Sequence, residues 1–97
     1  MIDKIKIGWK VYDIKKAESA LNSGDELYGQ IDYNTQVITL RAQNSMEQDE
    51  CTLIHEILHG VDDIYGFGFE EDVVERLSNA LYALVVDNRI NLFAKKE

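Results

Sequence analysis

The spacing of the apolar residues changes at Ser45, and this change limits the folds open to the chain. Before it, along Ile5 to Val11, apolar and polar residues alternate as in a strand with one buried face. After Ser45, apolar residues recur every three or four positions, which is the period of an amphipathic helix. We therefore expect an α+β fold in which a small antiparallel sheet is followed by helices.

The N-terminal part predicts a first strand over Ile5 to Val11. A short helix or irregular turn is expected next, over roughly Ile14 to Leu21. It should end at Asn22-Ser23-Gly24-Asp25, a cluster of residues that favour turns.

Two further strands are predicted as a hairpin. They cover Tyr28 to Tyr33 and Gln36 to Arg41, and Asn34-Thr35 separates them. The alternation in the second of these strands directs Ile38 and Leu40 toward the core.

Two helices are expected after the sheet. The first begins at a capping box formed by Ser45 and Gln48, and it should end near Gly66. The second begins around Glu70 with acidic residues, which suit the positive end of a helix dipole, and runs to about Asp87. Its predicted core face consists of Val73, Leu77, Leu81, Leu84 and Val85.

Length and charge limit the kinds of partner. The 97 residues suit one domain, residues 1–97. A net charge of −8 argues against nucleic acid and anionic membranes and favours a basic peptide or protein segment. We expect neither a secretory signal nor a membrane span. Cys51 is the only cysteine, so no internal disulfide can form, and a reducing cytoplasm is the expected compartment.

Both histidines of the chain lie in the pentapeptide His55-Glu56-Ile57-Leu58-His59. On a helix, residues four apart lie one above the other, so the two imidazoles can bind the same metal ion. Glu56 projects about 100° round the helix from His55, where it can accept a proton from a metal-activated water without occupying a metal position. The pattern predicts a zinc site better than it predicts two solvated histidines.

A catalytic zinc site usually has three protein ligands, so a third residue should join the two histidines. If the second helix returns antiparallel from about Phe69, residues equally far from the turn at Gly66 lie at the same height. By this argument Glu75 lies level with His59, and we predict it as the third ligand. Glu71 would lie about 6 Å nearer the turn. Because Glu71 and Glu75 are four residues apart, the sequence leaves an exchange of their roles open.

Other polar residues lie near the motif. Asn79 is expected level with His55, where it can accept a hydrogen bond from the ring nitrogen that faces away from the metal. An ordinary polar helix residue is an equally good interpretation. Asp62-Asp63 is more often a solvated helix end than a ligand pair. Cys51, one turn before His55, is more often a small buried residue than a ligand.

The motif resembles a known family. His55-Glu56-x-x-His59, with a glutamate on the next helix, is similar to the gluzincins, and residues 55–88 resemble small phage and prophage members of the ImmA/IrrE-like metallopeptidase group. The resemblance implies a minimal zincin-like fold and one functional set, namely the Zn²⁺ ligands His55, His59 and Glu75 with Glu56 as the general base. A metzincin is excluded because Asp62 and Tyr65 occupy the positions of its glycine and third histidine.

These residues predict a zinc-dependent metallopeptidase that hydrolyses peptide bonds of a specific protein through a metal-activated water. An oxyanion donor is expected among the tyrosines, either Tyr82 or one of the predicted hairpin. An extended substrate could add to the strand Gln36 to Arg41 if that strand is an exposed edge.

Family resemblance implies a repressor-like regulator as the substrate and, for a phage or prophage protein, the cytoplasm of a bacterial host. The alternative is a catalytically inactive, metal-stabilised protein-interaction module of phage or prophage origin. A nucleic-acid accessory protein is disfavoured by the charge.

Overall fold

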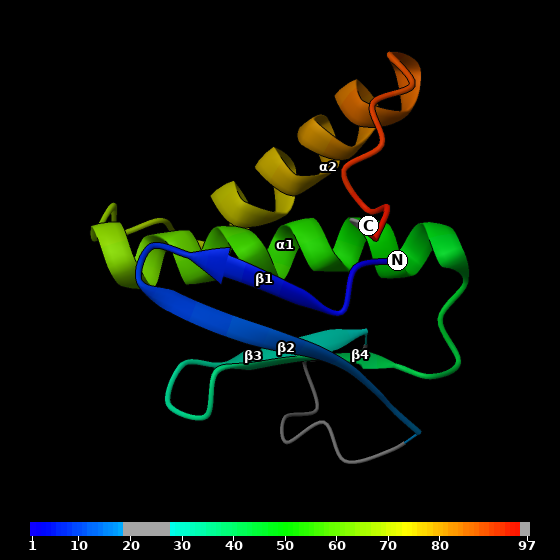
Figure 1. The fold of residues 1–97 in the computed structure, drawn as a ribbon. Coiled ribbons are helices and arrows are strands. Elements are labelled where there is room, and N and C mark those ends of the chain that lie inside the picture. Colours follow the sequence, from blue (N-terminus) through cyan, green and yellow to red (C-terminus); the bar gives the residue numbers. More distant parts are fainter. Residues whose placement is uncertain (19–27, 96–97) are drawn as a thin grey trace.

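A computed structural model describes residues 1–18 and 28–95, and within these ranges it contains a four-stranded sheet and two helices (Figure 1). The elements in chain order are β1 (Lys4–Ile7), β2 (Lys10–Ala17), β3 (Gly29–Asp32), β4 (Val37–Arg41), α1 (Met46–Tyr65) and α2 (Glu71–Asp87). The change of spacing at Ser45 therefore separates sheet from helices, and the predicted α+β class is confirmed.

The sheet is mixed, whereas the sequence suggested an antiparallel one. Its strand order is β1-β2-β4-β3. The outer pairs are antiparallel, but β2 and β4 run parallel at the centre. Because β4 lies between β2 and β3, Gln36 to Arg41 is not an exposed edge, and the proposal of substrate addition there is wrong. The edge strands of the described sheet are β1 and β3, and both contact α1.

The first predicted strand is a hairpin. Residues Gly8 and Trp9 form the turn between β1 and β2, and Gly8 has a positive φ of 61°. Ile7 pairs with Lys10 across this turn. A two-residue turn keeps the alternation of side chains in step, so the sequence pattern alone did not reveal the reversal of the chain.

The second strand is longer than the sequence suggested. Residues 14–17, expected as a helix or irregular turn, continue β2 and pair with β4. The tertiary contact with β4 supplies the backbone hydrogen bonds that select the strand here. The remainder of that prediction, including Asn22 to Asp25, lies outside the described residues.

The predicted β3–β4 hairpin is confirmed. Ile38 and Leu40 of β4 are 0% and 1% exposed. The carboxylate of Asp32 accepts hydrogen bonds from the backbone amides of Asn34 and Thr35 at 2.9 and 3.0 Å. These two bonds hold the pKa of Asp32 below its usual value and fix the turn.

Helix α1 lies between the sheet and α2 (Figure 1). The hydroxyl of Ser45 caps its first turn by accepting a hydrogen bond from the amide of Gln48 at 3.1 Å. The helix ends at Gly66, as the sequence predicted, and Gly66 adopts the left-handed conformation with φ of 69°. Leu53 and Ile54 are buried in the core that α1 shares with the sheet.

Helix α2 ends at Asp87, as predicted, and packs on α1. Of its predicted core face, Val85 is buried but Leu84 is 54% exposed. Within the described residues, no helix is both long and apolar enough to cross a membrane. The chain then returns to the N-terminal segment, where the Ile2 amide donates to the Phe93 carbonyl at 2.8 Å.

Candidate metal centre

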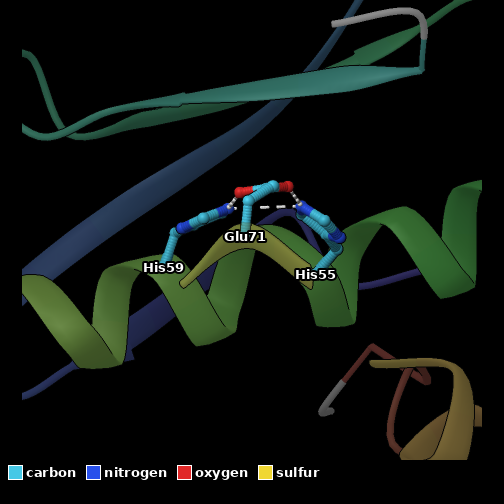
Figure 2. Close-up of side chains that lie close together, drawn as sticks. All are labelled: His55, His59 and Glu71. Carbon is cyan, nitrogen blue, oxygen red and sulfur yellow. Dashed lines mark hydrogen bonds and ion pairs between the residues drawn. The ribbon is translucent and has the colours of Figure 1, made fainter. Parts of the chain in front are cut away.

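Three side chains from the two helices converge on one point (Figure 2). The Nε2 atoms of His55 and His59 lie 3.2 Å apart. One oxygen of the Glu71 carboxylate is 2.8 Å from Nε2 of His55, and the other is 2.9 Å from Nε2 of His59. Two imidazole nitrogens and a carboxylate thus face a common centre.

The chemistry and spacing of these donors suit zinc. Two imidazoles and a carboxylate form a donor set of the kind found in catalytic zinc sites. Ligands about 2.05 Å from a tetrahedral ion are about 3.3 Å apart, close to the separations seen between the three donors. His55 and His59 are only 19% and 23% exposed, so their rings have little freedom to turn away. The three side chains therefore can hold a metal ion.

Helix α1 presents the whole motif along one border of the core. The residues between the histidines fix its rotation, because Ile57 and Leu58 pack against the buried cluster. Glu56 is 7% exposed and lines the same cavity as the imidazoles. Glu56 therefore contributes to the cavity wall and is not a member of the three-residue cluster.

The third member of the cluster is Glu71, not the Glu75 that the sequence argument preferred. The predicted height rested on a tight turn after Gly66. Instead, residues 66–70 are not helical, and Gly66 and Gly68 have positive φ angles of 69° and 73°, so the helical rise of about 1.5 Å per residue does not apply to this connection. The connection therefore runs back along α1, and α2 begins closer to the motif than the prediction assumed.

The contacts of Asp62 show directly that the segment between α1 and α2 runs back along α1. The Asp62 carboxylate accepts hydrogen bonds from the amides of Gly68 and Phe69 at 2.6 and 3.0 Å. Because Asp62 lies less than one turn after His59, these bonds place the start of α2 beside the motif. Asp62 thus acts on the connection, a role that the sequence did not suggest, since the residues it binds are six and seven positions away.

A cavity of about 920 Å³ surrounds the cluster and lies between β3 and the two helices. Its described lining comprises Tyr28, Gly29, Ile31 and Tyr33 from the strand region, Gln48, Cys51, Thr52, His55, Glu56 and His59 from α1, and Glu71, Glu75, Ser78 and Asn79 from α2. The cluster is therefore accessible to a ligand, and the wall opposite the helices is an edge strand.

Gly29 allows β3 to approach α1 closely. A Cβ atom at this position would lie 2.7 Å from Cγ2 of Thr52 and 2.9 Å from the carbonyl oxygen of Thr39. No larger residue fits without a shift of the strand or helix. The absence of a side chain at Gly29 therefore brings the strand wall alongside the helix that carries the motif.

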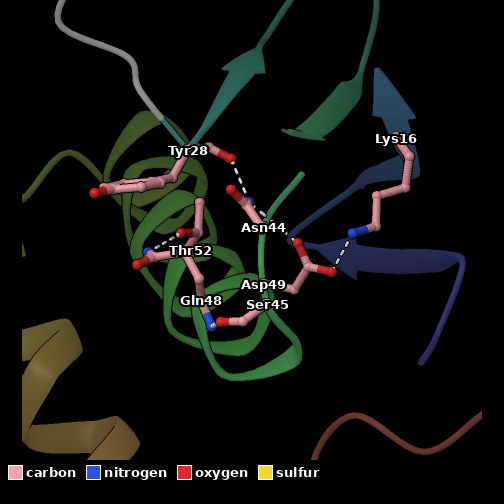
Figure 3. A network of polar contacts seen from close by, with 7 residues as sticks. All are labelled: Lys16, Tyr28, Asn44, Ser45, Gln48, Asp49 and Thr52. Carbon is pink, nitrogen blue, oxygen red and sulfur yellow. Dashed lines mark hydrogen bonds and ion pairs between the residues drawn. The ribbon is translucent and has the colours of Figure 1, made fainter. Parts of the chain in front are cut away.

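A polar network supports the end of the cavity near Tyr28 (Figure 3). The side-chain amide of Asn44 donates to the Tyr28 carbonyl at 2.8 Å and to Asp49 at 3.1 Å. Lys16 of β2 donates to the same buried Asp49 carboxylate. The network connects the sheet, the start of α1 and the beginning of β3.

The other polar candidates have different partners from those expected. The Cys51 thiol donates to the Asn79 amide oxygen at 3.4 Å, so Asn79 lies level with Cys51 and not with His55. The structure thus does not bring Asn79 to the predicted position. The register of α2 relative to α1 differs from the predicted one. This difference places Glu75 away from the imidazoles and places Asn79 beside Cys51.

Two further residues near the motif, Asp63 and Tyr82, also have partners within the protein. Asp63 forms an ion pair with Lys10 at 3.0 Å. The Tyr82 hydroxyl donates to Glu50 at 3.2 Å, and Tyr82 does not line the cavity. This leaves the tyrosines of the strand region as the candidate oxyanion donors.

Tyr33 has a phenol that keeps its proton. Burial, together with the negative charges of Asp63 and Glu56, raises the pKa of Tyr33 to about 12. Lys10 donates a hydrogen bond to the Tyr33 carbonyl at 3.1 Å, which anchors the backbone of this residue. Tyr33 therefore presents a protonated phenol at the cavity wall at neutral pH.

Comparison with protein-family models, curated proteins and solved structures finds no match for this chain.

Proposed function

We propose that the protein is a zinc-dependent metallopeptidase that cuts a specific protein substrate. The observation that carries this proposal is the convergence of His55, His59 and Glu71 in an accessible cavity beside the carboxylate of Glu56. The motif resembles that of the gluzincins, as the sequence indicated. A protein substrate, a repressor-like regulator among the candidates, and a cytoplasmic setting belong to the same proposal.

Each residue of the proposed site has a separate role. His55, His59 and Glu71 would hold the metal. Bound zinc would supply Lewis acidity, polarising a peptide carbonyl and lowering the pKa of a water molecule. Glu56 accepts the proton of the attacking water and passes it to the leaving amine.

The side of the cavity formed by the β3 region supplies the hydrogen-bond donor for the oxyanion. Tyr33 lines the cavity and its phenol stays protonated, so it can donate to the oxygen that gains negative charge during attack on the carbonyl. Tyr28 also lines the cavity and is the second candidate for this role.

The substitution Glu56→Gln tests the function, because it removes the proton acceptor while leaving the three donors in place. We expect zinc binding to be retained and peptide cleavage to fall by at least about a hundredfold. The measurement is turnover of a randomised pool of short peptides by zinc-loaded protein, read by mass spectrometry. Glu70→Gln, an exposed change outside the cavity, is the control.

Cleavage by the Glu56→Gln variant at the wild-type rate would overturn the mechanism. Failure of the zinc-loaded wild type to cut any peptide, with zinc bound at His55, His59 and Glu71, would instead favour the metal-stabilised interaction module.

A further inference from the structure

The cavity continues beyond the metal cluster, toward the N-terminal end of α1. In this part it is lined by Cys51 and Thr52 from α1 and by Glu75, Ser78 and Asn79 from α2. We call these five residues the Glu75 subsite. It is built from side chains that the proposed mechanism does not use.

Glu75 is the charged group of the subsite. No lysine or arginine belongs to the described cavity lining, and Glu75 forms no ion pair within the described residues. Its carboxylate is close enough to Cys51 to act with burial in raising the pKa of that thiol. Glu75 therefore places a negative charge on the side of α2 that faces the cavity.

The neighbouring polar groups are already occupied. The Ser78 hydroxyl donates to the backbone carbonyl of Glu75 at 2.9 Å. The amide oxygen of Asn79 accepts from Cys51. The subsite thus offers a carboxylate to an incoming ligand, with no protein cation beside it in the described lining.

The position of Glu75 matches the repeat of an extended peptide. Glu75 lies one helical turn, about 6 Å, along α2 from Glu71. In an extended chain, side chains on one face are about 7 Å apart. A peptide that runs along α2 with one carbonyl at the metal cluster would therefore place a side chain one or two positions away beside Glu75.

We propose that Glu75 determines substrate specificity by binding a lysine or arginine side chain one or two residues from the bond that is cut. This inference rests on the proposed function, because it assumes that a peptide lies across the metal cluster. Charge complementarity supports it, since the whole chain has a net charge of −8.

Binding to the zinc-loaded Glu56→Gln variant tests the subsite without requiring cleavage. The probes are two pools of short randomised peptides, with one position fixed as lysine in the first pool and as glutamine in the second. With Glu75 present, we expect about fivefold tighter binding of the lysine pool, as one partly exposed ion pair would give. Adding Glu75→Gln should remove this preference, whereas adding Glu70→Gln should preserve it.

Equal binding of the two pools, or a lysine preference that survives Glu75→Gln, would overturn the inference. Loss of zinc from the Glu75→Gln protein would overturn it too, because Glu75 would then be a metal ligand. The absence of peptide binding would count against the subsite. A lysine preference in binding, without cleavage by wild-type protein, would leave the subsite intact and refute only the peptidase.

Discussion

At the scale of single residues, the sequence identified the kind of site more reliably than it identified which residues contact one another in it. The spacing of His55 and His59 predicted a shared centre, and their Nε2 atoms lie 3.2 Å apart. The choice between Glu71 and Glu75 depended on the height at which α2 begins. That height is set by the hydrogen bonds that the Gly68 and Phe69 amides donate to the Asp62 carboxylate, and such contacts leave no periodic signal in a sequence.

Tyr33 carries a prediction at this scale. Replacing it with phenylalanine removes the phenol that is proposed to stabilise the oxyanion, so kcat should fall by about tenfold to a hundredfold with little change in KM. The measurement is steady-state cleavage of a fluorogenic peptide by zinc-loaded protein. Tyr65→Phe is the control, since Tyr65 is exposed and does not line the cavity. A normal kcat for Tyr33→Phe would remove Tyr33 from the mechanism.

At the scale of elements, helices were easier to predict than strands. A helix is specified by local caps such as Ser45 and Gly66, and both residues cap α1, although the Gln48 side chain donates to Thr52 and does not complete the predicted capping box. Strands depend on partners that are distant in sequence. The parallel pairing of β2 with β4 extended a strand through residues 14–17, and a two-residue turn divided an apparently continuous strand.

The connection between α1 and α2 carries a prediction at the element scale. Asp62→Ala removes both hydrogen bonds to Gly68 and Phe69, so Glu71 should be held less firmly beside the imidazoles. We expect zinc affinity to fall by about tenfold to a hundredfold, measured by competition with a chelating dye. Asp62→Asn keeps one acceptor oxygen and should lose less. Unchanged affinity in Asp62→Ala would show that the connection does not position the ligand.

At the scale of the whole molecule, three regions of a short chain together line the cavity. Strand β3, helix α1 and helix α2 each contribute side chains to the cavity of about 920 Å³. The sequence predicted the order of sheet and helices, because the apolar period is a local property. It did not predict β3 as the wall, since strand order depends on the parallel pairing at the centre of the sheet.

The central claim is that His55, His59 and Glu71 form a zinc site, and metal content tests it most directly. Protein prepared with zinc at neutral pH, then freed of unbound metal, should contain about one zinc per chain. Glu75→Ala should retain this zinc, and Glu71→Ala should lose most of it. Retention by Glu71→Ala together with loss from Glu75→Ala would contradict the ligand assignment, and a wild-type protein without zinc would contradict the site itself.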